Sequence, residues 1–224
     1  MRTSNTFLAT ILLLASSASN AIVVNAFDQG WYDNAGRHFS SNINYSAGSY
    51  TNTLAFEEWH NFFAFDLSGI SGNVTSAVFR LHILDTDNGA YTSTNGIFSL
   101  YDVNTSLSAL LADSSSDIQI FNDLGSGNSY GSKALSTLDA YTFRDIVFNS
   151  EGLAAINNTL GGTFAFGGNV DNLFRIGGGT PFFPPTLTLT VDETVPMPAP
   201  ISLALLVIGL AGIGVSVGKA GKGS

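Results

Sequence analysis

The chain contains no cysteine. A disulfide framework, a zinc site built from thiolates and a thiol nucleophile are therefore excluded. Basic residues are also scarce, with 8 Lys and Arg against 17 Asp and Glu and a formal net charge of -9. Nucleic acid is bound through clustered positive charge, and the few basic residues here are scattered, so we predict no nucleic-acid partner.

The common catalytic signatures are missing as well. No G-x-S-x-G, H-E-x-x-H, P-loop or dinucleotide-binding motif occurs in the sequence. We therefore predict that the chain is not an enzyme, that it has no catalytic residues and that it needs no cofactor or metal. A secreted glycan hydrolase remains as an alternative, and it would have to work without these signatures.

What the chain does contain is typical of a folded β protein. Hydrophobic residues make up 45% and charged residues 11%, which excludes a disordered, charge-rich chain. The 24 glycines, together with many Ser, Thr and Asn, suit a domain with many turns. From about Asp28 to Glu193 apolar residues recur with period two, which predicts strands with one buried face.

Two stretches show this alternation most clearly. In AVFRLHIL, residues 77–84, every second side chain from Ala77 to Ile83 is apolar, and Arg80 and His82 share the opposite face. In TLTLTVDE, residues 186–193, leucine and valine alternate with threonine, which predicts the last strand of the domain.

Further strands are expected between turn signals rich in Gly, Asn, Asp and Ser. Their ranges are 61–67, 96–103, 117–122, 141–149, 162–168 and 172–178. One short helix is expected in SEGLAAINNTLGG, where Leu153, Ile156 and Leu160 repeat at helical spacing, Ser150 can cap and Gly161 can end it. The fold class is therefore predicted as all-β, an antiparallel β-sandwich over residues 27–193 with one short helix.

The N-terminus has the features of a secretory signal peptide, predicted over residues 1–26. Arg2 precedes an apolar run from Phe7 to Ala15, and small residues follow with possible cleavage points after Ala21 or Ala26. The alternative is a buried first helix or an uncleaved anchor, although the apolar run is too short to span a membrane.

The C-terminus predicts a transmembrane helix. Residues 201–217 are apolar and uncharged, and as a helix they would reach about 26 Å at ~1.5 Å per residue. A Pro-rich stem, residues 194–200, separates this segment from the domain. Lys219 and Lys222, in the tail 218–224, would form a cytoplasmic stop and leave the domain outside.

This C-terminal order resembles a known sorting signal. Val195-Pro196-Met197-Pro198, followed by an apolar span and basic residues, resembles the PEP-CTERM signal of Gram-negative bacteria, with Met197 where that family has Glu. The resemblance implies cleavage by an exosortase, a membrane-embedded transpeptidase, and transfer to the cell surface or into exopolysaccharide. An ordinary permanent anchor with a proline-rich stem is the alternative.

A second resemblance concerns the middle of the chain. NFFAFDLSGISGNVTSAVFRLHI, residues 61–83, resembles the strand-turn-strand segment of jelly-roll modules in bacterial surface proteins, some of which bind carbohydrate. The resemblance implies a jelly-roll-like architecture and carries no binding residue.

Several polar and aromatic residues are candidates for a site. EEWH, residues 57–60, offers two carboxylates, an indole and an imidazole, with Asp66 nearby in sequence, but neighbouring Glu57 and Glu58 would point to opposite faces of a strand. Possible glycan-binding residues are Trp31, Trp59 and Tyr91, whose flat apolar faces and polar edges suit sugar rings. Burial of these aromatic residues in the sandwich is the alternative.

Two features of the sequence bear on metal binding. DTDNG, with Asp85 and Asp87, has alternating oxygen ligands but breaks the EF-hand pattern, so a hairpin turn on Asn88-Gly89 is favoured and calcium in another geometry stays open. The three histidines have unrelated contexts, which argues against a zinc site.

These observations predict an exported structural or adhesive protein, associated with the cell surface or with exopolysaccharide. It would be held at the inner membrane before exosortase processing. The alternative is a carbohydrate-binding module of the cell envelope that uses Trp59 and nearby aromatic residues, with a surface glycan as its partner.

Overall fold

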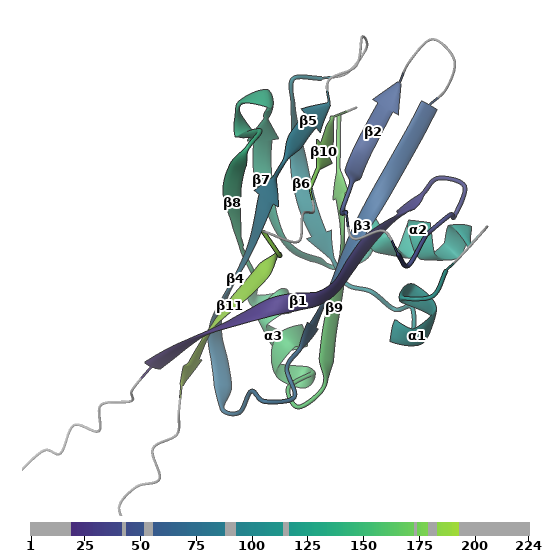
Figure 1. Ribbon diagram of the computed structural model, residues 1–224. Helices are drawn as coiled ribbons and strands as arrows, with labels where there is room; N and C mark the ends of the chain where they lie inside the picture. The colour runs from purple at the N-terminus through teal and green to yellow at the C-terminus, as the bar shows by residue number, and fades with distance from the viewer. Residues whose placement is uncertain are drawn as a thin grey trace, which may run out of the picture. The chain divides into compact units, whose positions relative to one another are not determined.

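Antiparallel β-sheet forms most of the chain that the computed structural model describes, which comprises residues 19–41, 44–51, 56–87, 93–113, 117–172, 174–178 and 183–192 (Figure 1). The strands are β1 (Ser19–Asp33), β2 (Ala47–Thr51), β3 (Phe56–Asp66), β4 (Asn73–Ile83), β5 (Asp85–Asp87), β6 (Asn95–Tyr101), β7 (Ser129–Ser136), β8 (Thr142–Val147), β9 (Thr163–Val170), β10 (Arg175–Gly177) and β11 (Thr186–Asp192). The helices are α1 (Leu107–Leu110), α2 (Ile118–Leu124), α3 (Ser150–Asn158) and the 3-10 turn η1 (Thr137–Asp139). The predicted all-β, sandwich-like class is confirmed.

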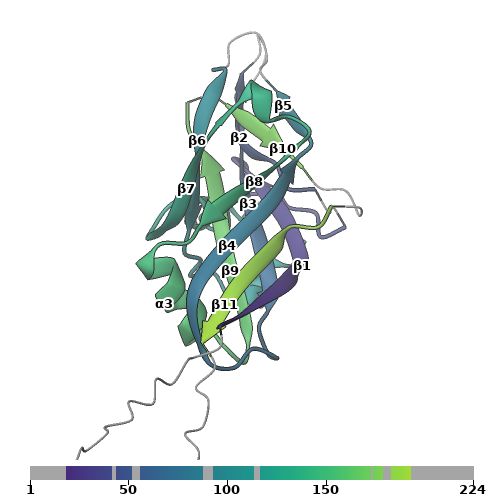
Figure 2. The same cartoon turned by 90° about the vertical axis from the view of Figure 1, so that its left-hand side faces the viewer.

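The strands form two layers. In one layer β1 pairs with β11, β11 with β4, and β4 with β8. In the other layer β3 pairs with β1, β2 and β9, β9 pairs with β6, and β6 with β7. The short strand β10 joins β2 to β5. Figure 2 shows β1, β11, β4 and β8 side by side, in front of β3 and β9, with β6 and β7 at the left of the view.

Strand β1 belongs to both layers. Its first half, from Ser19 to Asn25, pairs with β11, and its second half, from Ala26 to Asp33, pairs with β3. The register shifts at Phe27, as in a β-bulge, which lets a strand bend from one sheet to another. The strand therefore begins inside the segment predicted as a signal peptide.

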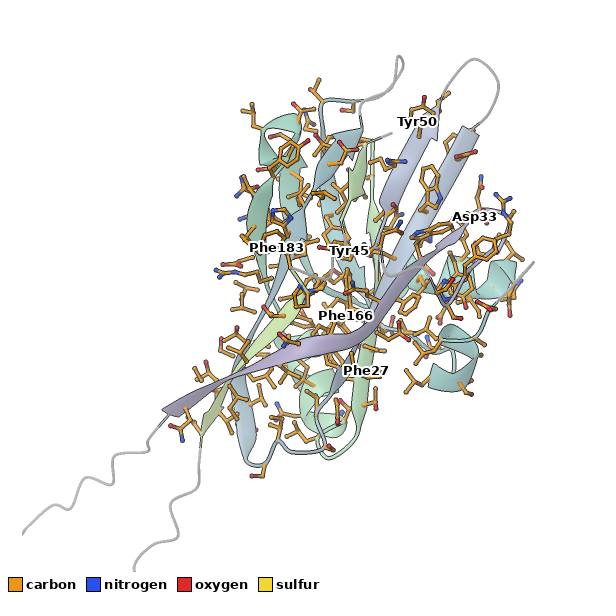
Figure 3. All side chains as sticks on the ribbon, viewed as in Figure 1. Phe27, Asp33, Tyr45, Tyr50, Phe166 and Phe183 are labelled. Atoms are coloured by element: carbon orange, nitrogen blue, oxygen red, sulfur yellow. The ribbon has the colours of Figure 1, made fainter. Side chains whose placement is uncertain are left out.

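The main core lies between the two layers and is rich in phenylalanine. The rings of Phe63 and Phe79 lie 4.7 Å apart, and those of Phe79 and Phe166 lie 5.0 Å apart. Tyr45 and Phe166 both lie toward the middle of the body in Figure 3. Edge-to-face and tilted ring pairs of this kind add to the free energy gained by burial.

The predicted alternation of β4 and β11 is confirmed with one exception. Their apolar positions are buried, namely Ala77, Phe79, Leu81 and Ile83 of β4 and Leu187, Leu189 and Val191 of β11. Arg80 is exposed and pairs with Asp145 of β8. His82 was expected on the wet face but is buried, because Phe183 stacks on its imidazole at 4.6 Å and Phe143 contacts it at 4.8 Å.

The predicted strand over residues 117–122 is wrong, because this segment forms α2. The Asp117 side chain caps the helix by accepting a hydrogen bond from the Gln119 amide at 3.2 Å. Ile120, Phe121 and Leu124 are buried in a second core on the other side of β3, with Tyr32, Phe62 and Leu110. An I-x-I pattern fits both a strand and a helix, and contact with β3 decides between them here.

The predicted short helix is confirmed as α3. Its N-cap is Asn149 rather than Ser150, since the Asn149 side chain accepts a hydrogen bond from the Gly152 amide at 2.9 Å. The helix packs on β4 and β7. None of the helices within the described ranges is long and apolar enough to cross a membrane. The predicted span 201–217, the stem before it and the tail after it lie outside those ranges.

Candidate functional site

The EEWH segment lies in β3, where alternation separates its side chains. Glu58 and His60 share one face, and His60 Nε2 lies 3.3 Å from Glu58 Oε1. The other ring nitrogen, Nδ1, lies 2.6 Å from the Phe121 carbonyl oxygen, and the imidazole stacks on the Phe121 ring at 3.9 Å. His60 therefore links β3 to α2.

Glu58 and Asp66 do not form the pair of carboxylates that glycoside hydrolysis needs. Glu58 contacts an imidazole, and Asp66 stands at the other end of β3, where it accepts a hydrogen bond from the Ser68 amide. Eight residues of strand separate Glu58 from Asp66 by about 26 Å, whereas the two catalytic carboxyl groups lie roughly 5–9.5 Å apart.

Two of the three predicted glycan-binding aromatic residues lie together. The rings of Trp31 and Trp59 meet edge to face with centroids 6.5 Å apart, and Trp31 Nε1 donates a hydrogen bond to Asn44 Oδ1. Trp59 is only 9% exposed, and the Arg175 guanidinium lies 5.1 Å from its ring centroid. Arg175 therefore covers one face of the Trp59 ring. Tyr91 lies outside the described residues.

The histidines lie in three separate environments. His38 stacks on Tyr32 at 4.7 Å, and its Nδ1 lies 3.0 Å from the Trp31 carbonyl oxygen. Burial lowers the pKa of His38, and the Trp31 carbonyl opposes this shift. In the part of the chain that the structure describes, no group of three or more His, Cys, Asp and Glu side chains could hold a metal ion.

Asp85 and Asp87, the residues of the calcium hypothesis, belong to β5, where they pair with Gly177 and Arg175 of β10. The Asn88-Gly89 turn lies outside the described residues.

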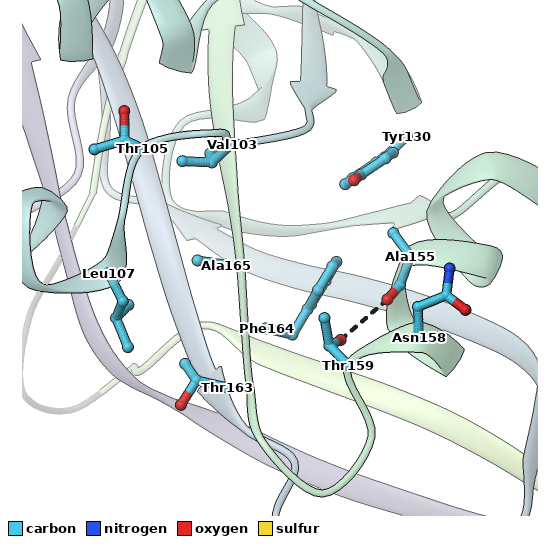
Figure 4. A pocket seen from close by; sticks show the side chains of 10 residues that line it. All are labelled: Val103, Thr105, Leu107, Tyr130, Ala155, Asn158, Thr159, Thr163, Phe164 and Ala165. Carbon is cyan, nitrogen blue, oxygen red and sulfur yellow. Dashed lines mark hydrogen bonds between the residues drawn. The ribbon is translucent and has the colours of Figure 1, made fainter.

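A notch in the second layer forms a cavity that the sequence did not predict. Strand β6 pairs with β9 only as far as Tyr101, opposite Gly167, whereas β9 continues along β3 to Thr163. The chain after β6 and helix α3 border the uncovered part of β9. Together with β7 they enclose about 300 Å³ (Figure 4).

The cavity is lined half by apolar and half by neutral polar side chains. The apolar ones are Val103, Leu107, Ala155, Phe164 and Ala165, and the polar ones are Thr105, Tyr130, Asn158, Thr159 and Thr163. Among the described residues, no Asp, Glu, Lys, Arg or His contributes to the lining. The site is therefore suited to an uncharged ligand.

Two of the polar side chains already have partners. The Thr105 hydroxyl donates to Asp123 Oδ2 at 2.6 Å, and the Thr159 hydroxyl lies 3.0 Å from the Ala155 carbonyl oxygen (Figure 4). These bonds hold the loop after β6 and the end of α3.

The Tyr130 hydroxyl has no such partner. Tyr130 is 8% exposed, its ring stacks on Phe164 at 6.1 Å, and no described residue forms a hydrogen bond with its hydroxyl. Figure 4 shows the hydroxyl end turned toward the other lining residues. Burial and the nearby carboxylates of Asp102 and Glu151 raise its pKa, so it keeps its proton at neutral pH.

Sequence reasoning missed this site because its residues come from four separate segments. Tyr130 stands in DLGSGNSYGS, a stretch whose Gly, Ser and Asn residues are typical of a turn. A single Tyr after a Gly/Ser-rich loop was the one signal available, and it has no meaning without the three-dimensional arrangement.

No protein-family model matches the chain, and no curated protein matches it either.

Proposed function

We propose that this chain is an exported structural or adhesive protein of the cell surface or exopolysaccharide of a Gram-negative bacterium, sorted through its C-terminal signal. The observation that carries the proposal is the order of parts after residue 194. Pro196, Met197 and Pro198 would form the element that the exosortase recognises, residues 201–217 the membrane helix, and Lys219 and Lys222 the cytoplasmic stop.

The arrangement of the strands supports a jelly-roll-like body. In one layer the neighbouring strands follow the order β1-β11-β4-β8. In the other layer the order is β3-β9-β6-β7. Two four-stranded sheets between which the chain passes back and forth are typical of the double Greek key. Jelly rolls recur in lectin and surface modules, which is a likeness of fold and not of function.

The position of the chain ends also supports attachment at a surface. Ser19 and Asp192 are directly paired, so the first and last described residues of the body lie at the same end of β1 and β11. A tether at this end would leave the opposite end of the sandwich, with the loops between its strands, free for other molecules.

Processing is tested by determining the C-terminus by mass spectrometry in membrane and medium fractions of the native host. We expect a mature chain that lacks residues 201–224. A surface protein that keeps Lys219 and Lys222 would mean that the tail is a permanent anchor.

Variants of the motif make this test specific. Replacing Pro196 and Pro198 by Ala should leave the chain unprocessed, whereas Pro200→Ala, outside the four-residue motif, should be processed normally. Met197→Glu restores the residue of the PEP-CTERM pattern and should increase the processed fraction. Equal processing of all three variants would argue against the proposed recognition element.

A carbohydrate-binding module of the envelope is the second candidate, favoured by the uncharged cavity beside Tyr130. Glu58 and Asp66 lie too far apart along β3 to act as a catalytic pair. Binding without hydrolysis also suits a matrix protein.

A further inference from the structure

The cavity beside Tyr130 contains a hydrogen-bonding group that no described residue uses. The Tyr130 hydroxyl oxygen remains accessible from the cavity, so water or a ligand there can pair with it. Asn158 and Thr163 lie at the exposed rim, and their side chains likewise form no hydrogen bond with any described residue. Three such groups around one hollow point to an external ligand with several hydrogen-bonding groups.

The walls of the cavity require that the ligand also have apolar faces. Phe164 and Ala165 of β9 form one side, and Val103 and Leu107 line the approach from the chain after β6 (Figure 4). A sugar ring has both properties, with hydroxyl groups at its edge and C–H groups on its faces. An apolar peptide side chain would leave the Tyr130 hydroxyl unpaired.

The charges around the cavity favour a neutral sugar over an anionic one. The lining has no cation to pair with a carboxylate or sulfate, and Asp102 and Glu151 place negative charge near Tyr130. The Asp102 carboxylate is fixed by the Asn128 amide at 2.7 Å and by the Asn128 side chain at 2.8 Å. An anionic sugar would therefore be repelled, and a neutral one would not.

Size limits the ligand to one ring at a time. About 300 Å³ is at the lower end of the roughly 300–1,000 Å³ that small-molecule pockets occupy. Because Thr163 and Asn158 are exposed, the rest of a polysaccharide chain could continue into solvent on either side of the bound unit.

We infer that this cavity binds a neutral hexose unit of a surface polysaccharide, with Tyr130 donating a hydrogen bond to a sugar oxygen and the half-buried side chains of Val103 and Leu107 contacting a ring face. The inference rests on the proposed function for its biological setting. It places the glycan site at the notch between β9, β7 and α3 rather than at Trp31 and Trp59.

The test is calorimetric titration of the full chain, purified in detergent, with cellotetraose, laminaritetraose, mannotetraose and galactotetraose, and with oligomannuronate as the anionic probe. At least one neutral probe should bind, and oligomannuronate should not. Tyr130→Phe removes only the hydroxyl and should weaken the binding about tenfold, which corresponds to ~1.4 kcal/mol. Ala155→Trp fills the cavity and should abolish it.

Matched variants keep the test falsifiable. Tyr141→Phe removes the hydroxyl of a tyrosine that is 75% exposed outside the cavity and should leave the affinity unchanged. Thermal unfolding must show that Tyr130→Phe and Ala155→Trp remain folded. If Ala155→Trp does not fold, the test relies on Tyr130→Phe alone.

Two results would overturn the inference. One is the absence of binding to every neutral probe. The other is binding that survives in Tyr130→Phe and Ala155→Trp but is lost in Trp59→Ala, which would place the glycan site at the tryptophans. Neither result affects the sorting proposal, which depends on the C-terminus alone, and a permanently anchored chain could still bind the hexose.

Discussion

At the scale of single residues, Asn157 shows how one side chain fastens a helix to a sheet. Its Oδ1 accepts a hydrogen bond from the Val74 amide at 2.8 Å, and its Nδ2 donates to the Val74 carbonyl at 2.9 Å. Asn157→Ala leaves both backbone groups of a buried residue without these partners. We expect the free energy of unfolding to fall by about 1–3 kcal/mol, measured by urea denaturation.

The neighbouring residue is a natural control for this prediction. Asn158 is exposed and forms no hydrogen bond with any described residue, so Asn158→Ala should change the free energy of unfolding by no more than about 0.5 kcal/mol. Equal losses in the two variants would show that the contacts with Val74 are not what stabilises the position.

His38 predicts how stability depends on pH. Burial lowers its pKa, while Trp31 O, Asp28 and Asp113 oppose the shift. In the unfolded chain the His38 imidazole takes up a proton below its ordinary pKa of about 6.5. In the folded protein the imidazole stays neutral until the pH falls further, because its pKa is lowered. This contribution to stability is therefore complete above about pH 6.5 and is lost as the pH falls toward the lowered pKa.

The measurement is the free energy of unfolding between pH 7 and pH 5. The lowered pKa values of Asp139 and Asp145 act at more acidic pH, since their contribution is present above the ordinary aspartate pKa and is lost as the pH falls below it. The stability of the wild type should decline over the interval, and that of His38→Phe, which keeps a ring beside Tyr32, should decline less. An unchanged slope in the variant would contradict the assignment to His38.

At the scale of elements, α2 lies so close to β9 that only glycine fits at residue 167. A Cβ there would lie 2.4 Å from the Leu124 carbonyl oxygen and 2.6 Å from its Cα. These are backbone atoms, so Gly167→Ala has to displace the helix. We expect a loss of about 1–3 kcal/mol in the free energy of unfolding, and faster amide hydrogen exchange over residues 118–124.

Gly69 provides the comparison. A Cβ at Gly69 would meet nothing within 4 Å, so Gly69→Ala should be neutral or stabilise the protein by up to about 1 kcal/mol. A Gly167→Ala variant as stable as Gly69→Ala, with unchanged exchange in α2, would show that the helix is not held against β9.

The same elements show what the sequence could predict. Strands β4 and β11 were predicted because each buries one face against a single core. Burial of one face produces the alternation of apolar and polar residues that the sequence shows. Helix α2 was misread because its apolar pattern is ambiguous over six residues, and its contacts with Phe62 and Tyr32 come from distant strands. The cavity at Tyr130 depends on where β6 stops pairing with β9, and no local pattern encodes that point.

At the scale of the whole molecule, the first strand limits where a signal peptide could be cut. Residues Ser19 to Asn25 pair with β11, and Ile22 and Val24 pack against the main core, while Val23 faces outward. Cleavage after Ala26 would remove this half of β1. It would leave β11 paired only with β4 and turn its other side into an exposed sheet edge, which favours aggregation.

Cleavage after Ala21 keeps both core residues, so an exported chain should begin at Ile22. Mass spectrometry of the N-terminal peptide from the mature protein decides between Ile22 and Phe27. A chain expressed from Phe27 should have a free energy of unfolding at least ~2 kcal/mol lower than one expressed from Ile22, because it loses the partly buried side chains of Ile22, Val24 and Ala26. A mature N-terminus at Phe27, with equal stability of the two chains, would mean that the pairing of β1 with β11 before Ala26 is dispensable to the sandwich.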